Sequence, residues 1–473
     1  MKHYTSFAEI SRDLQSGALS CEQLVRHYIE NIKKHENLNA FLEVFEEEAL
    51  ETAARVQQKL KDGTAGKLAG LVVGIKDVLA YQDHELSGSS KILQGFQSQF
   101  TASAIQSLLD EDAIIIGRQN CDEFGMGSST ENSAYGITRN GVGEDKVPGG
   151  SSGGSAVAVQ MDMCQVSLGT DTGGSVRQPA AFCGVVGLKP TYSRISRYGL
   201  AAYASSFDTI GILAKSVEDT ALVLEVAAGQ DEFDSTVSTK AVPSYSKGLG
   251  KTGAYKVAYL GETVDTKGIE PAVKDTFQQF LSDLSSQGHQ VEKVNFGLLD
   301  YLLPTYYILT TAEASSNLSR YDGVKYGHRT EHPTGLEEMY KGSRSEGFGD
   351  EVKRRIMLGT FVLSASYYDA FYTKAQKARR LIKERTEEIL SEYDFIVSPT
   401  TPTTAFCIGS INDPVEMYLE DLYTVQASVS GIPAISIPAG QDQDGLPIGV
   451  QIMSSHFAEE KLLAFSQQVL SKN

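Results

Sequence analysis

The sequence predicts an α/β protein, one large domain in which a mixed, largely parallel central sheet is covered by helices. Short apolar runs rich in β-branched residues recur along the chain, and each is closed by Gly, Pro or polar residues. Helical stretches separate these runs, and strands that are apolar on both sides are typical of a sheet buried on both faces. The runs expected to form strands span residues 70–80, 113–117, 165–169, 256–261, 394–399, 434–440 and 448–453.

The first 65 residues predict an N-terminal helical segment. Ser20 and Gln23 have the spacing of a capping box, and apolar residues then recur with a helical period as far as Ile32. A second helix is expected over residues 45–62, ending before a glycine. Much later in the chain, residues 365–393 predict one long surface helix.

The domain organisation is predicted to be simple, with residues 1–473 forming a single domain. Residues 66–225 hold the Gly- and Ser-rich motifs described below, and we expect them to form the catalytic core. The segment 235–255 is rich in Ser, Gly and Lys, which predicts an exposed connection.

Composition and charge exclude several classes of protein. The chain has 473 residues, of which 41% are hydrophobic and 22% charged, as in ordinary globular proteins. The net charge of −18 disfavours direct binding to the phosphates of a nucleic acid. No apolar run reaches the length of a membrane span, and the start does not resemble a signal peptide, so a cytoplasmic protein without membrane contact is expected. Five cysteines without a CxxC pair predict reduced, buried thiols and no metal site.

The stretch "VPGGSSGGSAVAV" (147–159) places serines among glycines, directly before small apolar residues. The glycines permit unusual backbone angles, and we expect Ser151 at the N-terminus of a helix of about 11 residues. The strand at 165–169 then runs back and delivers "TDTGGSVRQPAAF" to the same end. Because sites in α/β proteins form at the carboxyl ends of strands, Ser151 and Ser175 are expected to meet there.

A serine nucleophile needs a base and donors for the oxyanion. Backbone N–H groups of Thr172, Gly173 and Gly174, together with that of Ser175, can point into one small volume because two of these residues lack a Cβ. Lys76 interrupts an apolar strand, where burial lowers the pKa of its amine and lets it take a proton. Strand alternation directs the neighbouring aspartate to the other face.

Three other motifs have weaker support. "GGSSG" also fits the nucleophile elbow of a Ser-His-Asp enzyme, but the polar "EDKVP" stands where that motif needs a strand, and this alternative stays open. "HRTEH" (328–332) fits a zinc-protease pattern, although Pro333 and the flanking residues indicate a loop. "GLGKT" (248–252) lacks the upstream glycine of a phosphate-binding loop and predicts no ATP site.

Lys76, "GGSSGGS" and "DTGGSVR", taken together, resemble the amidase signature family. The similarity continues through "RQPAAFCGVVGLKPTYSRISRYGL" and extends along the chain. The resemblance implies a catalytic triad with Ser175 as nucleophile, Ser151 as proton relay in cis-Ser conformation and Lys76 as base, which agrees with the spacing argument. It also implies no metal or cofactor in the amidase site.

Within that family the chain is most similar to the glutaminase subunits of tRNA-dependent amidotransferases. This implies hydrolysis of glutamine to supply ammonia for converting Glu-tRNA(Gln) to Gln-tRNA(Gln), or Asp-tRNA(Asn) to its amide. It also implies a heterotrimer with partner subunits B and C, in which a partner uses ATP and Mg and holds most of the tRNA.

The same resemblance implies a glutamine pocket. Arg355 is expected to receive the α-carboxylate, and Asp421 the α-ammonium group. Tyr306, Ser128 and Ser129 are expected to line the pocket. Two alternatives stay open: a stand-alone amidase that hydrolyses small amides with the same triad, and a scaffold subunit without activity.

Overall fold

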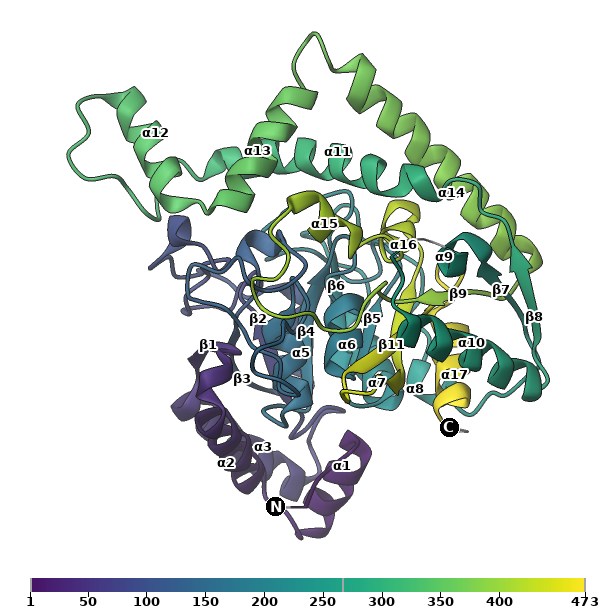
Figure 1. The fold of residues 1–473 in the computed structure, drawn as a ribbon. Helices are drawn as coiled ribbons and strands as arrows, with labels where there is room; N and C mark the ends of the chain where they lie inside the picture. Colours follow the sequence, from purple (N-terminus) through teal and green to yellow (C-terminus); the bar gives the residue numbers. More distant parts are fainter. Residues whose placement is uncertain (1, 266–267, 472–473) are drawn as a thin grey trace.

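One mixed sheet crosses the middle of the molecule in the computed structural model, which describes residues 2–265 and 268–471 (Figure 1). Within these residues the sheet has 11 strands in the order β1-β3-β2-β4-β6-β5-β10-β11-β9-β7-β8. They are β1 (Phe41–Val44), β2 (Val72–Lys76), β3 (Ile114–Gln119), β4 (Val166–Asp171), β5 (Val186–Lys189), β6 (Thr209–Ala214), β7 (Lys256–Leu260), β8 (Gln290–Val294), β9 (Phe395–Pro399), β10 (Ala434–Gln441) and β11 (Pro447–Met453).

The mixed α/β sheet is confirmed, with parallel pairing in two groups. Strands β3, β2 and β4 are parallel neighbours, as are β9, β7 and β8. The middle of the sheet, from β4 through β6, β5, β10 and β11 to β9, is antiparallel, so parallel pairing is less extensive than predicted. One reason is the tight turn at residues 442–446, which reverses the chain between β10 and β11 and makes them antiparallel.

All seven expected strands are present, and four further strands were not predicted. Two of these, β1 and β8, lie at the sheet edges and are only partly buried. Charged residues therefore interrupt the apolar pattern from which a buried strand is predicted. The other two, β5 and β6, are fully buried and lie between β4 and β10.

Helices cover the sheet. Strand β4 leads through a short loop into α6, and α5 packs against β4 and β2. A second group, α11, α13, α14 and α16, encloses its own hydrophobic core. The helices are α1 (Phe7–Ser16), α2 (Cys21–Lys34), α3 (Glu46–Asp62), α4 (Ser103–Asp110), α5 (Gly153–Gln160), α6 (Arg177–Cys183), α7 (Val217–Ala227), α8 (Tyr245–Gly248), α9 (Gly261–Asp265), α10 (Pro271–Ser286), α11 (Leu299–Asn317), α12 (Leu336–Gly347), α13 (Asp350–Val362), α14 (Lys374–Glu392), α15 (Pro414–Leu419), α16 (Val425–Ser430) and α17 (Glu459–Leu470).

The predicted N-terminal helices are confirmed. Ser20 and Gln23 form the capping box of α2, and α3 ends at a glycine in the left-handed conformation, Gly63. The long helix expected over 365–393 is shorter, because α14 starts at Lys374 after a π-helical turn at Asp369–Thr373. No helix in the described ranges is long and apolar enough to cross a membrane.

Two smaller expectations need correction. The connection at 235–255 is not wholly exposed, because it contains α8, whose Tyr245 side chain is buried. Of the five cysteines, four are buried as free thiols as expected, but Cys407 is exposed.

Candidate active site

Lys76 lies at the carboxyl end of β2 and is completely buried. Its Nζ atom lies 2.7 Å from Ser151 Oγ, 2.9 Å from Ser152 Oγ and 2.9 Å from Thr170 Oγ1. Burial lowers the pKa of the amine, although nearby acidic groups oppose this effect. Asp77 is turned away from Lys76, as predicted, and pairs with Arg118 at 2.7 Å. The neutral amine is therefore easier to form here, next to the Ser151 hydroxyl, than at an exposed lysine.

Ser151 is held between Lys76 and the start of α5. The Gly150–Ser151 peptide bond is cis. The helix is shorter than predicted and begins at Gly153, so Ser151 precedes it by two residues. Ser152 occupies the N-cap position without capping the helix, because its hydroxyl instead contacts Lys76 and the backbone of Thr170.

Ser175 lies in the loop between β4 and α6, next to the Ser151 segment. The backbone N–H of Ser152 donates to the Ser175 carbonyl at 3.1 Å, so the two serine motifs are brought together as predicted. Gly173, Gly174 and Ser175 are buried, and within the described part of the chain their N–H groups donate to no acceptor. Buried N–H groups are almost always paired, so three unpaired donors next to Ser175 are unusual. They are available to bind an oxyanion.

The loop before Ser175 is packed so tightly that it needs glycines. A Cβ on Gly173 would lie 2.5 Å from the Tyr306 ring, and one on Gly174 would lie 2.2 Å from Thr424 Oγ1. Gly174 also has φ +148, which disfavours other residues. The Thr424 hydroxyl donates to the Gly173 carbonyl at 2.6 Å, and Thr172 donates to Asp208 at 2.7 Å. These contacts fix the path of residues 172–175, which we call the donor loop.

Arg177, the second residue after Ser175, clamps this loop to the rest of the sheet. Its guanidinium forms two bonds to Asp171, at 2.9 and 2.8 Å, and both side chains are fully buried. Burial of Asp171 opposes its ionisation, but the charge and hydrogen bonds of Arg177, together with the charge of Lys189 and the N–H of Val176, outweigh this and lower the carboxyl pKa. Arg177 also donates to the Thr424 carbonyl at 2.7 Å and to Ser428 at 3.0 Å.

Arg355 projects inward from α13 and is 3% exposed. It pairs with Glu351, one helical turn earlier, at 2.7 Å and donates to the Tyr203 hydroxyl at 3.0 Å. Its guanidinium also lies 5.3 Å from the Tyr307 ring centre and 5.5 Å from that of Tyr418. These groups hold the guanidinium in one orientation.

Asp421 lies between α15 and α16 and faces the same aromatic group. It accepts hydrogen bonds from Ser128 at 3.0 Å and from the Tyr307 hydroxyl at 2.7 Å. Burial raises the pKa of Asp421 to about 6, while these two hydrogen bonds oppose the rise. Tyr307 therefore connects Asp421 to Arg355, and the neighbouring Tyr306 packs on the donor loop at Gly173.

A cavity of about 290 Å³ opens beside these residues. Ser129, Arg355 and Tyr418 line it, with Glu351 and the start of α15 on its other side. Thus the structure brings together the predicted pocket residues Arg355, Asp421, Tyr306, Ser128 and Ser129 around one group of tyrosines.

Several residues of the site were not predicted. Glu351 stands four residues before Arg355, a helical ion-pair spacing that could have been noticed. Ser152 and Thr170 stand in or next to the quoted motifs but were given no role. Tyr203, Tyr307 and Tyr418 come from three distant segments, and no local pattern marks them.

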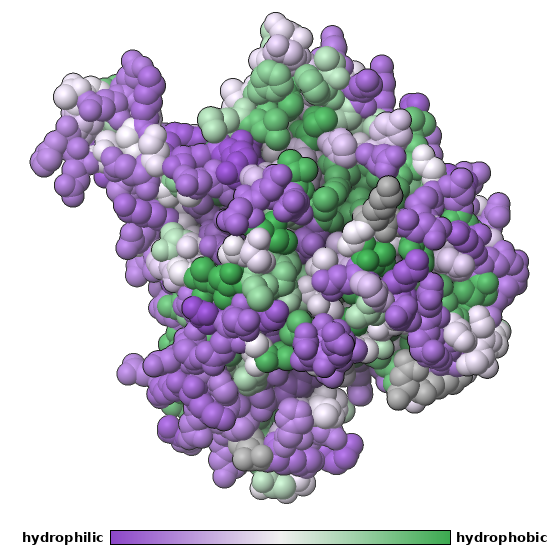
Figure 2. Space-filling model, in the orientation of Figure 1, coloured by the Kyte–Doolittle hydropathy of each residue, from purple (hydrophilic) through white to green (hydrophobic). Residues whose placement is uncertain are grey.

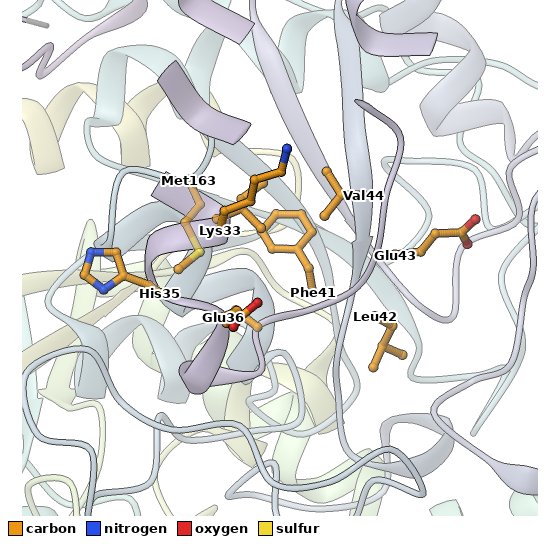
Figure 3. A pocket seen from close by; sticks show the side chains of 10 residues that line it. Lys33, His35, Glu36, Phe41, Leu42, Glu43, Val44 and Met163 are labelled. Atoms are coloured by element: carbon orange, nitrogen blue, oxygen red, sulfur yellow. The ribbon is translucent and has the colours of Figure 1, made fainter. Parts of the chain in front are cut away.

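The other motifs do not join this site. The HRTEH segment forms a loop before α12, as predicted, and the His328 ring contacts Glu346 at 2.8 Å. A separate cavity of about 210 Å³ lies at the β1 edge of the sheet (Figure 3). It is lined by residues such as Lys33, Phe41 and Met163, and by none of the predicted site residues.

The chain is similar in sequence and in fold to several known proteins. The family model described as Amidase matches residues 23–463. The A subunit of the glutamyl-tRNA(Gln) amidotransferase from Chlorobium phaeobacteroides (strain BS1) is 48% identical over 475 residues, covering 99% of this chain and 98% of that protein. The crystal structure of the protein of the same name from Thermotoga maritima is 39% identical with a TM-score of 0.77, covering 94% of this chain and 90% of that one. A peptide amidase bound to the competitive inhibitor chymostatin is 28% identical with a TM-score of 0.83, covering 98% and 96% of the two chains.

Proposed function

Because the chain belongs to the amidase signature family, we propose that it hydrolyses glutamine and supplies the ammonia to a tRNA-dependent amidotransferase. The observation that carries this proposal is that Arg355 and Asp421 meet at Tyr307. Ser128, which donates to Asp421, packs against Gly150, the residue before Ser151. A guanidinium suits the α-carboxylate of an amino acid, and a carboxylate suits its α-ammonium group. The full-length relatives named as amidotransferase subunits support the same substrate.

The proposed reaction begins when the neutral Lys76 amine takes a proton from Ser151. Ser151 takes the proton of Ser175, whose Oγ attacks the side-chain amide carbon of glutamine. The N–H groups of Gly173, Gly174 and Ser175, with Thr172 at the start of the loop, would stabilise the oxyanion. The C–N bond then breaks, Ser151 gives its proton to the leaving nitrogen, Lys76 returns its own proton to Ser151, and ammonia departs.

A γ-glutamyl ester on Ser175 remains after this step. Water attacks the ester carbon with its proton taken through the same Ser151–Lys76 path, and the same backbone donors serve again. Glutamate leaves and Ser175 regains its proton. This cycle uses no metal or cofactor in this chain.

The remaining chemistry would belong to partner subunits B and C in a cytoplasmic heterotrimer. ATP and Mg would be used there to activate Glu-tRNA(Gln), or Asp-tRNA(Asn), before ammonia attacks. The net charge of −18 supports this division, since an acidic chain is poorly suited to hold tRNA.

A stand-alone amidase is the second candidate function, because the peptide amidase with similar structure is also a member of this fold group. The two candidates differ in the pocket. Arg355 and Asp421 are needed for an amino-acid substrate, whereas a simple amide needs only the serine and lysine residues.

The deciding experiment measures ammonia release from glutamine, asparagine and acetamide, with and without co-expressed partner subunits. We expect release from glutamine that disappears in Ser175→Ala and falls strongly in Arg355→Ala and Asp421→Ala. Equal or faster release from acetamide would favour the stand-alone amidase. Absence of hydrolysis under every condition, with a complex that still forms in Ser175→Ala, would favour a scaffold subunit.

A further inference from the structure

The backbone on both sides of Ser151 is enclosed by the protein. Figure 2 shows mostly hydrophilic side chains on the outside of the molecule, whereas residues 147–159 are buried throughout and Ser151 is 0% exposed. Backbone N–H and C=O groups in such a segment need partners inside the protein. The partners that they find decide where the Ser151 hydroxyl lies.

The hydroxyl of Thr130 binds this segment before and after Ser151. Its Oγ1 atom donates to the Gly149 carbonyl at 2.8 Å and accepts the N–H of Gly153 at 3.0 Å. Thr130 is 0% exposed, and a Cβ on Gly153 would lie 2.3 Å from its Oγ1, so the two residues are in tight contact. One hydroxyl therefore fixes both ends of the segment 149–153, which has Ser151 at its centre.

Asp122 joins Thr130 to Ser151 by a second route. Its carboxylate accepts the N–H of Thr130 at 2.9 Å, and its own N–H donates to the Ser151 carbonyl at 3.1 Å. The N–H of Gly150 donates to the Gln178 side chain at 2.8 Å. Thr130, Asp122 and the segment that carries Ser151 thus form a closed ring of hydrogen bonds.

Thr130 holds this position with a backbone conformation that suits threonine poorly. Its φ angle is +59, in the left-handed region, which is a true outlier for a β-branched residue and costs free energy. Such strain persists where the surrounding contacts impose it, and it is concentrated at functional sites. Glycine would adopt this angle without strain but has no hydroxyl.

We infer that Thr130 is a positioning residue for the serine relay, and this inference rests on the proposed function. Its hydroxyl sets the segment that carries Ser151, and with it the 2.7 Å contact between Ser151 Oγ and Lys76 Nζ. Thr130 acts through Ser151 and takes no proton itself. Because the reaction depends steeply on geometry, a displacement of about 1 Å slows it about 100-fold.

The loop that contains Thr130 also reaches the glutamine pocket. Ser128 donates to Asp421 at 3.0 Å, and Ser129 lines the cavity beside Arg355. The contact between Ser128 and Asp421 does not use the Thr130 hydroxyl. Loss of that hydroxyl should therefore slow the chemical step and leave glutamine binding largely intact.

The test measures ammonia release from glutamine by three variants of the full-length chain, co-expressed with the partner subunits. Thr130→Val keeps the shape of the side chain without its hydroxyl, and we expect kcat to fall about 10- to 100-fold while KM changes less than about threefold. Thr130→Ser keeps the hydroxyl and should restore most of kcat. Thr130→Gly removes the hydroxyl together with the backbone strain, so it should fold and still show the fall in kcat.

Thr386→Val in α14 is the matched control. Thr386 is also 0% exposed, and its hydroxyl donates to the Ile382 carbonyl at 2.8 Å and accepts from Gln426 Nε2 at 3.2 Å. This variant loses the same kind of hydroxyl and should keep kcat, compared at equal folded fraction. An equal loss of kcat in the control would overturn the positioning role, as would a Thr130→Ser variant as slow as Thr130→Val. If Thr130→Val does not fold, Thr130→Gly decides, and a kcat equal to that of the wild type overturns the inference.

Failure of the proposed function would give a different result. The serine relay serves any amide, so a wild type that hydrolyses acetamide but not glutamine would refute the glutaminase role alone. The same Thr130 variants would then show their loss of kcat with acetamide. A wild type that hydrolyses neither amide would overturn both proposals.

Discussion

At the scale of single residues, Lys76 shows how burial creates a base. Its amine bonds to three hydroxyls and, among residues 2–265 and 268–471, to no carboxylate, so no direct contact there fixes the positive charge. Desolvation lowers the pKa, and the fraction of neutral amine therefore increases as the pH rises. Only the neutral form can take the proton of Ser151.

We therefore predict that kcat/KM for glutamine rises with pH through the pKa of Lys76 and then levels off. Lys76→Met should reduce the rate by about 10² to 10⁴, the usual contribution of a general base. Ammonia release measured across pH checks both. Lys189 is a matched control, because it is also fully buried with a pKa lowered by burial to about 7, but it contacts the Pro190 carbonyl at 3.0 Å. Lys189→Met with the same loss of rate, at equal folded fraction, would contradict the assignment.

Asp421 gives a second pH effect, in which burial shifts the pKa upward instead of downward. Burial raises its pKa to about 6, so its carboxylate is charged above that pH and becomes protonated below it. If it binds the α-ammonium group, KM for glutamine should rise as the pH falls through about 6. Asp421→Asn should remove this dependence and raise KM by roughly 10- to 100-fold at pH 8, as expected for a lost charged hydrogen bond. Acetamide lacks the ammonium group, so an identical acid limb with acetamide would rule out this role.

At the scale of elements, the position of α13 is set by one carboxylate of the catalytic core. Glu123 accepts the N–H of Gly349, the N-cap residue of α13, at 2.8 Å and also bonds to Ser90. The adjacent Asp122 accepts the N–H groups of Thr130 and Asn132. A carboxylate at this end also suits the helix dipole. Glu123 thus joins the loop beside Lys76 to the helix that carries Arg355.

Glu123→Ala should therefore raise KM for glutamine about tenfold while kcat is largely kept, because Arg355 shifts but the triad does not. Glu123→Gln should restore most of the affinity, since its amide oxygen can still accept from Gly349. Loss of a helix cap costs about 1 kcal/mol of stability, so urea unfolding should be measured alongside. Glu338→Ala is the control, because Glu338 accepts the N–H of Thr334 just before the neighbouring α12. An equal change of KM in both variants would argue against a positioning role.

The same elements show what a sequence can predict. The buried strands around Lys76 were found because they are apolar on both faces, whereas β1 and β8 were missed because edge strands carry charges. The long helix at 365–393 was expected because its pattern is helical. In the structure residues 365–368 form turns, Asp369–Thr373 form a π-helical turn, and α14 begins only at Lys374. The helical period of the apolar residues does not show whether a segment packs against the rest of the protein or stays exposed.

At the scale of the whole molecule, the site combines segments from most of the chain. The meeting of Ser151 and Ser175 could be predicted from spacing, because a helix and a strand of similar length return the chain to its starting point. Lys76 could be predicted because it interrupts an apolar strand. Arg355 and Asp421 were found only through the family resemblance. Their tyrosine partners come from distant elements, and contacts of this kind depend on the packing of the complete fold.

Arg177 is the contact that depends most on the whole fold. It joins Asp171, at the end of β4, to the Thr424 carbonyl and, through Gln451, to β11. Arg177→Met should leave Asp171 buried without its partner and lower the free energy of unfolding by about 3–5 kcal/mol in urea titrations. Adding Asp171→Asn should recover part of this loss, because the unpaired charge is removed.

The loss of unfolding free energy predicted for Arg177→Met depends on pH. The folded-state pKa of Asp171 is lowered, so in the wild type this pair stabilises the fold above the pKa of the unfolded carboxyl and the effect is lost as the pH falls through the folded value. In Arg177→Met the buried carboxyl instead prefers its proton, and the free energy of unfolding, relative to the wild type, should improve as the pH falls. Lys341→Ala removes an exposed pair with Glu337 and should change stability by less than about 0.5 kcal/mol. Equal urea midpoints for Arg177→Met and Lys341→Ala would show that the clamp does not hold the sheet together.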